Sequence, residues 1–291
     1  AKKYAEVGKV SKVTAFVVAD WYDSYLAAVS KHKSDPAGFT DTMFSTLLEL
    51  VREASESPYA FECFHRAVHG PRFDYYTFGV TFAGALVDTA NCRLVGADVV
   101  ADIEKKLAAK HNVVFLSNHQ SEGDPHALDI ILSARAGINP IARDVVFMAG
   151  DRVRDDATVA PFSMGRNLLT VYSKKHIASP PELRATKMSH NRKTLKEAET
   201  LFKAGGACLW LAPSGGRDRR DPASGKVIPA AFDPDAIEMM RLTARRAAAN
   251  GGRPTHFYPM AMATYRLLPP PEAVGGALGE KRVVTYGPLH L

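Results

Sequence analysis

The sequence predicts an α/β protein, in which a small N-terminal helical bundle precedes a larger domain with a mixed, mostly parallel β-sheet flanked by helices. Two observations carry this prediction. Apolar residues recur every three or four positions in the first part of the chain, and short apolar runs alternate with helical stripes further on. Alternating strands and helices imply right-handed crossovers and a sheet covered on both faces. We place the helical domain at residues 1–80 and the α/β domain at residues 81–291.

Two helices are expected in the N-terminal part. Apolar residues step by three or four through residues 10–25, and the same period returns in residues 44–51. Thr40 and Asp41 resemble a cap signal for the second helix, and Pro58 closes it. No strand pattern of comparable quality precedes the α/β part.

The α/β part is expected to begin with a helical stripe that leads into a buried strand. Residues 113–116 form the short continuous apolar run that is typical of a parallel strand covered on both faces. A later helix through residues 195–202 is stopped by Gly205 and Gly206. The expected strands are 113–116, 145–150, 168–172, 208–212, 256–262 and 282–286, and the expected helices are 99–110, one from about 124, one through 195–202, and 233–249.

Composition excludes some classes of protein. The chain of 291 residues is long enough to bury a sizeable core, and its longest uncharged apolar stretch, residues 77–87, is far shorter than a bilayer span. We therefore expect no transmembrane segment. Residues from Ala1 onward show no cationic leader with an apolar core, so we expect any targeting segment to be absent from this chain.

The charge balance favours an anionic partner. Lys and Arg number 37 against 31 Asp and Glu, which gives a net charge of +6. Nucleic acid is not expected, because the basic residues are not interleaved with an aromatic platform or a nucleic-acid-binding motif. The three cysteines are far apart, without a C-x-x-C pair, which argues against a zinc site and a disulfide framework and favours a reducing compartment.

The segment FLSNHQSEGDPHALDI, residues 115–130, places His119 and Asp124 after a predicted strand. Ligands of open α/β sheets gather outside the carboxyl ends of the strands. An imidazole there can act as a general base, and a carboxylate on its other nitrogen would fix its tautomer. Asp124 also suits a helix N-cap with Pro125 at the first helical position, and a carboxylate has enough acceptor sites for both roles.

Two basic clusters follow other predicted strands. Lys175 and His176 lie in VYSKKHI, residues 171–177, where a basic run is also typical of a solvated surface. Arg217 and Arg219 lie in LWLAPSGGRDRR, residues 209–220, and an extended backbone would point both guanidiniums to one side. Two planar forks on one face suit a phosphate dianion, although a solvated charged loop is the alternative. Ser214 lies in a turn outside any G-x-S-x-G motif, so a serine nucleophile is weakly supported.

These motifs carry a family resemblance. NHQSEGD (118–124) resembles the glycerolipid acyltransferase signature, in which a His is followed after four residues by an Asp. VYSKKHI and APSGGRDR (212–219) further resemble the soluble, chloroplast-type glycerol-3-phosphate acyltransferases, whose small N-terminal helical domain agrees with the helical first part. In that family's plant pattern, Thr and Ala stand in place of Ser121 and Gly123.

The resemblance implies transfer of a fatty acyl group from acyl carrier protein, or from acyl-CoA in vitro, to the first hydroxyl of glycerol 3-phosphate in the plastid stroma. It implies that His119 is the general base, Asp124 is its partner, and Lys175, His176, Arg217 and Arg219 bind the phosphate. No metal or other cofactor is expected. The alternatives are a lysophosphatidate acyltransferase, a metal-dependent phosphoesterase using Asn118 and His119, for which further ligands are not found, and a non-enzymatic basic module that binds acidic protein or anionic lipid.

Overall fold

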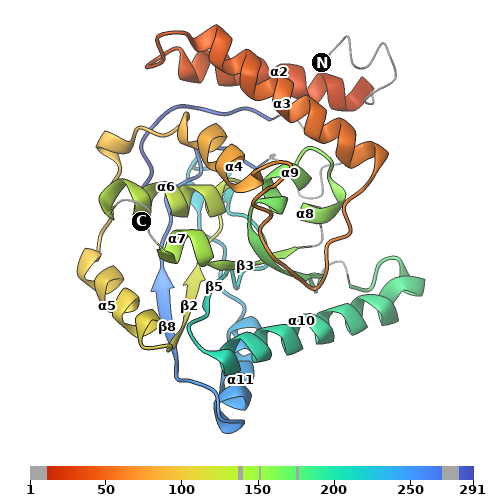
Figure 1. Ribbon diagram of the computed structural model, residues 1–291, viewed down its shortest axis with the longest axis vertical. Coiled ribbons are helices and arrows are strands. Elements are labelled where there is room, and N and C mark those ends of the chain that lie inside the picture. Colours follow the sequence, from red (N-terminus) through yellow and green to blue (C-terminus); the bar gives the residue numbers. More distant parts are fainter. Residues whose placement is uncertain (1–11, 137–139, 151, 175–176, 271–281) are drawn as a thin grey trace.

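The computed structural model, shown in Figure 1, describes residues 12–136, 140–150, 152–174, 177–270 and 282–291. Its centre is a six-stranded sheet with the order β1-β4-β3-β5-β2-β8, in which β1 is antiparallel and the other pairs are parallel. The strands are β1 (Phe64–His65), β2 (Asn112–Ser117), β3 (Val146–Gly150), β4 (Asn167–Val171), β5 (Cys208–Leu211) and β8 (Thr255–Met260).

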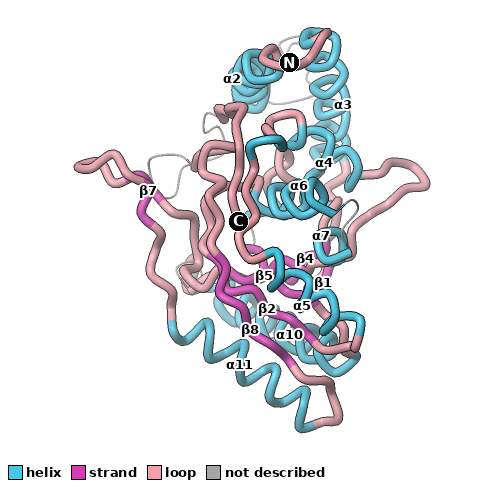
Figure 2. Tube along the Cα trace, turned by 90° about the vertical axis from the view of Figure 1, so that its left-hand side faces the viewer, coloured by secondary structure: helices cyan, strands magenta, loops and turns pink. Residues whose placement is uncertain are grey.

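Helices cover the sheet, and a separate hairpin stands away from it. The hairpin joins β6 (Arg219–Arg220) to β7 (Val227–Ile228) and extends outward in Figure 2. The helices are α2 (Lys12–Val29), α3 (Pro36–Glu56), α4 (Tyr75–Gly84), α5 (Ala97–Ala108), α6 (Asp124–Ala136), α7 (Pro140–Asp144), α8 (Arg152–Asp155), α9 (Ala160–Met164), α10 (Arg184–Ala204) and α11 (Pro234–Ala249), with short 3-10 turns at Thr89–Asn91 and Pro181–Leu183. The α/β class with a mostly parallel, mixed sheet and N-terminal helices is confirmed.

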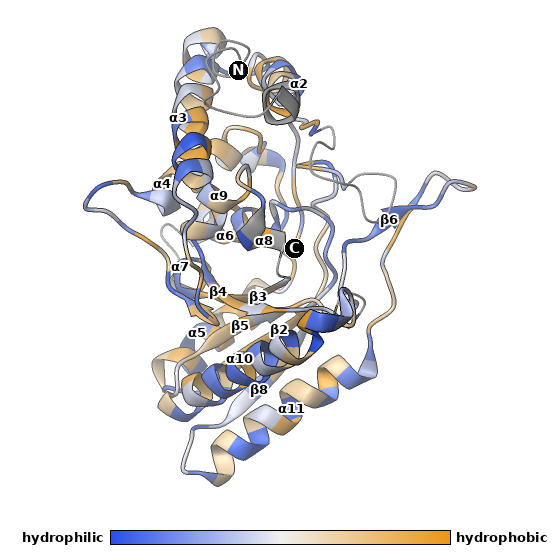
Figure 3. Ribbon diagram, turned by 90° about the vertical axis from the view of Figure 1, so that its right-hand side faces the viewer, coloured by the Kyte–Doolittle hydropathy of each residue, from blue (hydrophilic) through white to orange (hydrophobic). Residues whose placement is uncertain are grey.

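The sheet is buried on both faces, which explains its continuous apolar runs. In β2, Val113 and Phe115 belong to one core cluster and Val114 to the other, because successive side chains of a strand point to opposite faces. Residues of α10 and α11 complete the smaller cluster, and residues of α2, α3, α4 and α6 complete the larger one. Figure 3 shows the central strands largely in the colour of apolar residues between these helix layers.

Helix α3 begins earlier than the sequence analysis predicted. Its N-cap is Asp35, whose carboxylate accepts a hydrogen bond from Gly38 N at 3.0 Å, and Pro36 occupies the first helical position. Thr40 lies inside the helix, and its hydroxyl donates to Pro36 O at 2.7 Å. The predicted cap at Thr40 and Asp41 is therefore wrong, because an Asp-Pro pair five residues earlier supplies both the side-chain acceptor and the preset φ.

The sequence analysis missed one strand of the sheet and wrongly predicted another. The edge strand β1 was not predicted, since two residues are too few for a periodic pattern; Phe64 pairs with Leu169 of β4. Residues 282–286, predicted as a strand, are all described by the structure and form no strand there. The chain there passes beside the end of α4, where a backbone bond joins Gly287 N to Leu86 O at 3.2 Å, and of its two valines only Val284 is buried.

The larger core cluster runs without a break from the N-terminal helices to the sheet. It contains Trp21 of α2 and Phe44 of α3 together with Phe82 of α4 and Phe115 of β2. Helix α4 itself crosses residue 80, and the division of the chain at that residue stays a prediction. Within the described ranges, no helix has both the length and the apolar character that a bilayer crossing requires.

Candidate active site

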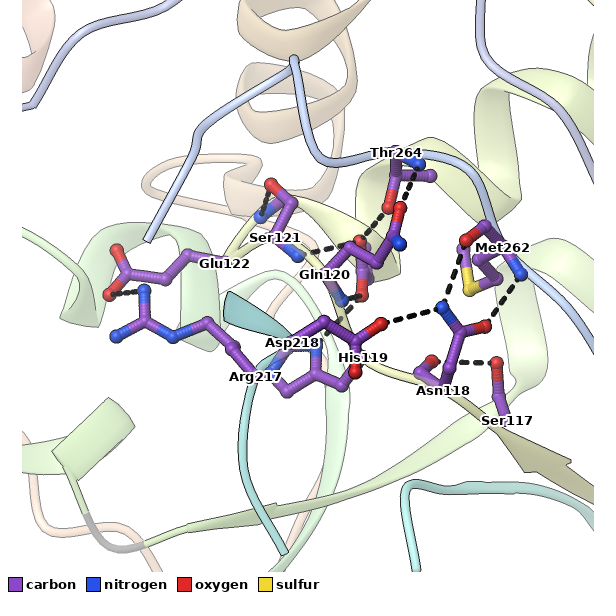
Figure 4. Close-up of polar contacts among 12 residues, drawn as sticks. Ser117, Asn118, His119, Gln120, Ser121, Glu122, Arg217, Asp218, Met262 and Thr264 are labelled. Atoms are coloured by element: carbon purple, nitrogen blue, oxygen red, sulfur yellow. Dashed lines mark hydrogen bonds and ion pairs between the residues drawn. The ribbon is translucent and has the colours of Figure 1, made fainter. Parts of the chain in front are cut away.

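Three parallel strands deliver polar residues to one place at the carboxyl edge of the sheet. Asn118 follows β2, and its amide nitrogen donates to Met262 O beyond β8 and to the Asp218 carboxylate beyond β5, both at 3.0 Å. Its amide oxygen accepts from Met262 N at 2.7 Å. Figure 4 shows Asn118 as the link between these segments. A single buried side chain therefore fixes how the three strand ends sit around His119.

His119 and Asp124 form a directly hydrogen-bonded pair. Nδ1 of His119 lies 2.7 Å from Oδ2 of Asp124, which is fully buried, whereas the imidazole keeps 25% of its surface exposed. An ionised carboxylate only accepts hydrogen bonds, so Nδ1 carries the proton in the neutral ring and Nε2 carries the lone pair. In the described part of the chain no hydrogen bond to Nε2 is seen. The ring edge-packs on Trp210 of β5 at 5.5 Å between centroids, which further limits its rotation.

The Asp124 carboxylate is held by the loop that precedes it. Oδ2 accepts from Gln120 N at 2.8 Å, Oδ1 accepts from Ser121 N at 3.1 Å, and the Thr264 hydroxyl donates to Oδ1. An N-cap carboxylate would instead accept from N–H groups further along the helix, but those of residues 126 and 127 donate to the carbonyl of Gly123. Asp124 therefore acts as an acceptor for the loop and the imidazole, and not as the helix cap.

Asp218 joins the loops beyond β2 and β5. Its backbone N–H donates to the carbonyl of His119 at 2.6 Å, and its fully buried carboxylate accepts from Asn118 and from Ala230 N at 2.9 Å. These contacts bring the Arg217–Arg219 segment directly against His119. Asp218 and Thr264 were not predicted as site residues, because Asn118 and Asp124, the side chains that they meet in the site, lie 100 and 140 residues away in the chain.

Arg217 lies against the His119–Asp124 loop. Its Nη1 is 2.8 Å from Oε1 of Glu122, and only 14% of its side chain is exposed. Glu122 also faces Arg282, whose Nε is 3.7 Å from Oε2, and Arg282 in turn pairs with Asp156 at 2.9 Å. Figure 4 shows Glu122 reaching Arg217. Two partly buried guanidiniums thus meet one carboxylate, three residues from the imidazole.

The other predicted phosphate ligands differ in how well they are placed. Arg219 opens β6 and is partly buried. Lys175 and His176 lie outside the described residues. The neighbouring Lys174 is exposed, and its Nζ lies 2.7 Å from Asp233 and 2.9 Å from Asp235, at the start of α11. These contacts are ion pairs on the solvated surface. Among the described residues, no three His, Cys, Asp or Glu side chains cluster in a way that could hold a metal ion.

A buried ion pair anchors α6, the helix that begins with Asp124. Nη1 of Arg166 lies 2.7 Å from Oδ2 of Asp129, and each side chain is only 2% exposed. The Arg166 guanidinium also lies over the ring of Tyr76 in α4, at 4.9 Å. Burial lowers the pKa of Arg166, and the Asp129 carboxylate opposes that shift. The pair therefore connects α6 to β4 and α4 through charges that water cannot reach.

Removal of one charge of this pair is expected to destabilise the fold strongly. Asp129→Ala should lower the free energy of unfolding by roughly 3–5 kcal/mol, because the Arg166 cation stays buried without its partner. Urea unfolding measures the effect. The exposed Arg241–Glu238 pair offers the matched control, since Glu238→Ala should cost no more than about 1 kcal/mol. Equal losses in the two variants would contradict the anchoring role.

The fold and the site define a class of protein. An open, mostly parallel sheet presents an imidazole whose Nδ1 contacts a buried carboxylate, beside a partly buried arginine. Residues 98–263 match the family model described as Acyltransferase, and the chain belongs to this family.

Curated plant proteins resemble the chain over nearly its whole length. The chloroplastic glycerol-3-phosphate acyltransferase of Arabidopsis thaliana is 39% identical over 286 residues, which cover 98% of this chain and 61% of that protein. The chloroplastic glycerol-3-phosphate acyltransferase ATS11 of Cucurbita moschata is 39% identical over 291 residues, which cover 100% of this chain and 64% of that protein. The chloroplastic glycerol-3-phosphate acyltransferase of Spinacia oleracea is 38% identical over 286 residues, which cover 98% of this chain and 59% of that protein. The chain thus spans about three-fifths of the length of these relatives.

Proposed function

We propose that the protein is a glycerol-3-phosphate 1-O-acyltransferase that uses acyl carrier protein thioesters as donors and forms lysophosphatidic acid. The observation that carries the proposal is the His119–Asp124 pair, with Nδ1 on the carboxylate and Nε2 directed away from it. The match to the acyltransferase family and the names of the relatives support glycerol 3-phosphate as the acceptor. Those names also support a plastid location, for which we propose the stroma.

His119 would carry the proton through the reaction. Nε2 accepts the proton of the sn-1 hydroxyl as the oxygen attacks the thioester carbonyl, and Asp124 stabilises the imidazolium that results. When the tetrahedral intermediate collapses, the C–S bond breaks and the carrier thiolate takes the proton from Nε2. A thioester is already an activated donor, so orientation of the acceptor and removal of its proton are the main demands on the protein.

Arg217 and Arg219, with Lys175 and His176, would bind the phosphate of the acceptor. A guanidinium has five N–H donors, so Arg217 can hold Glu122 through Nη1 and a phosphate through its other N–H groups. Because Glu122 belongs to the His119–Asp124 loop, this contact would set the distance between the phosphate and the hydroxyl that loses its proton. The net charge of +6 would also favour the approach of an acidic carrier protein.

A donor-by-acceptor activity matrix tests the function. Acyl carrier protein and coenzyme A thioesters are each mixed with glycerol 3-phosphate, lysophosphatidate or glycerol, and thiol release and the position of the acyl group are measured. We expect release with glycerol 3-phosphate and acylation at the sn-1 position. Release only with lysophosphatidate would identify the other acyltransferase activity, and no release with any pair would favour a non-enzymatic basic module.

The same assay tests the phosphate site. Arg217→Ala should raise the KM for glycerol 3-phosphate by about 10- to 100-fold, because charge-assisted hydrogen bonds contribute about 1.5–3 kcal/mol each. The KM for the thioester should stay within about twofold of the wild-type value if Arg217 contacts only the acceptor. Arg241→Ala, on the exposed face of α11, is the control. An unchanged KM for glycerol 3-phosphate in Arg217→Ala would remove Arg217 from the phosphate site.

A further inference from the structure

A thiol and an imidazole meet at the β1 edge of the sheet, four strands away from β2, the strand that leads to His119. Cys63 directly precedes the edge strand β1, and its Sγ lies 3.5 Å from Nδ1 of His190 in α10. The carbonyl of Cys63 accepts from Thr170 N of β4 at 3.0 Å. Figure 2 shows β1 and β4 together at this side of the molecule. Backbone bonds of the sheet thus fix the position of the thiol.

The hydrogen bonds of His190 determine which ring nitrogen faces the thiol. Nε2 lies 2.9 Å from the carbonyl oxygen of Thr170, and a carbonyl can only accept, so Nε2 carries the hydrogen. In the neutral ring, Nδ1 is then the acceptor, and this atom lies 3.5 Å from Sγ of Cys63. The backbone carbonyl of His190 lies 3.9 Å from the same sulfur and is its second acceptor. A thiol becomes a nucleophile when it loses its proton, and His190 presents an acceptor for that proton.

The residue that carries the thiol lines an open hollow that can admit a small molecule. The hollow has a volume of about 820 Å³, and Cys63 is one of its lining residues. Three basic side chains line it, Arg66, Lys193 and Lys196, together with the acidic Glu62 and Glu197, so the charge of the lining is 3 − 2 = +1. The environment is mildly favourable for an anionic reagent.

The other two cysteines have no comparable access. Cys92 and Cys208 are buried, whereas Cys63 is only partly so. Burial raises the pKa of the Cys208 thiol far above its ordinary value, and the thiol of Cys92 donates to the carbonyl of Asp88 at 3.3 Å. Reactivity of a protein thiol depends on access, and burial denies access at these two positions.

We propose that Cys63 is a thiol-modification site, at which His190 assists exchange with small, carboxylate-bearing disulfides. The Cys63 proton passes to Nδ1 of His190, and Sγ attacks one sulfur of the disulfide. A new S–S bond forms as the reagent's own S–S bond breaks, and the departing thiolate takes the proton. Cys63 is oxidised to a mixed disulfide, the reagent is reduced to one thiol, and no other oxidant is needed.

The site is tested by exposing the folded protein to oxidised glutathione at neutral pH, with peptide mass mapping and the rate of thiol release as readouts. We expect one adduct, on Cys63, and none in Cys63→Ser. Unfolding in denaturant should make all three cysteines reactive, which verifies the reagent. Equal modification of Cys92 or Cys208 in the folded protein, or an unmodified Cys63, would overturn the proposal.

The role of His190 is tested by His190→Gln, which keeps an N–H donor for the Thr170 carbonyl and loses the proton acceptor. Modification of Cys63 should slow by roughly tenfold at neutral pH, because the thiolate is the reacting form. An unchanged rate in a variant with wild-type circular dichroism would remove His190 from the site.

The charge of the hollow is tested with a variant whose fold is safe, because both altered side chains are exposed. Lys193→Gln with Lys196→Gln changes the charge of the lining from +1 to −1. Reaction with oxidised glutathione should slow by about two- to fivefold, reaction with cationic cystamine should speed up, and neutral hydroxyethyl disulfide should show no change. Lys31→Gln with Lys105→Gln, outside the hollow, is the matched control. The same response in both double variants would refute a local charge effect.

Discussion

His119→Ala is expected to lower kcat for acyl transfer by roughly 10²–10⁴-fold, the usual contribution of a general base, without loss of the fold. The imidazole is the one group of the pair with surface exposure, so its removal leaves the loop intact. Asp124 keeps the backbone N–H groups of Gln120 and Ser121 and the Thr264 hydroxyl as donors.

The control for this variant is another imidazole on the same sheet. His256 lies near the amino end of β8, and its Nε2 is 3.0 Å from Nδ1 of His111. His119 follows the opposite, carboxyl end of the neighbouring strand β2. His256→Ala should leave kcat within about twofold of wild type, since it removes an imidazole far from the proposed proton transfer. Turnover of His119→Ala close to that of His256→Ala would end the assignment of the base.

The central strands could be predicted from the sequence because their pattern has one physical cause. In residues 113–116 of β2 and throughout β5 every side chain meets a core, with Val113 and Trp210 on one face and Val114 and Leu209 on the other. Both stretches therefore form continuous apolar runs in the sequence. The edge strand β1 has no such constraint. Its two residues are set by pairing with Leu168 and Leu169, a hundred residues away, and leave no local pattern.

The sequence could likewise indicate one part of the site and not the other. His119 and Asp124 are five residues apart, so a local motif could indicate both the base and the group that orients it. The contacts that hold this motif in place, from Asn118 to Asp218 and from Thr264 to Asp124, join positions 100 and 140 residues apart. Buried polar residues at strand ends were the available signal, but a single sequence does not say which of them meet.

The role of Glu122 was likewise outside the reach of the sequence. Arg217 was predicted to present its guanidinium to a phosphate, and the structure shows it paired with Glu122 of the His119–Asp124 loop. In the sequence, Glu122 is one of four residues between His119 and Asp124, and no local pattern marks it. Its two oxygens face Arg217 and Arg282, from distant parts of the chain, and only the folded arrangement reveals that shared carboxylate.

Asp124→Asn is expected to impair both activity and stability. The carboxylate accepts four hydrogen bonds, two at each oxygen, and an amide has a donor in place of one of those oxygens. If the NH₂ group faces His119, the ring must hold its proton on Nε2, and the base is lost. If it faces Ser121, a buried N–H loses its acceptor. We expect kcat to fall by roughly 10²–10⁴-fold and the free energy of unfolding to fall by about 1–3 kcal/mol.

Asp218→Asn separates these two effects, because Asp218 is an equally buried carboxylate in the same cluster that does not touch the imidazole. Its substitution should cost a similar amount of stability, about 1–3 kcal/mol by urea unfolding, since Asn118 and Ala230 donate to it. Its kcat should fall at least tenfold less than that of Asp124→Asn, because Nδ1 of His119 keeps its acceptor and Nε2 keeps its lone pair. Equal losses of kcat in the two variants would mean that Asp124 serves only to hold the loop, and that another group orients the base.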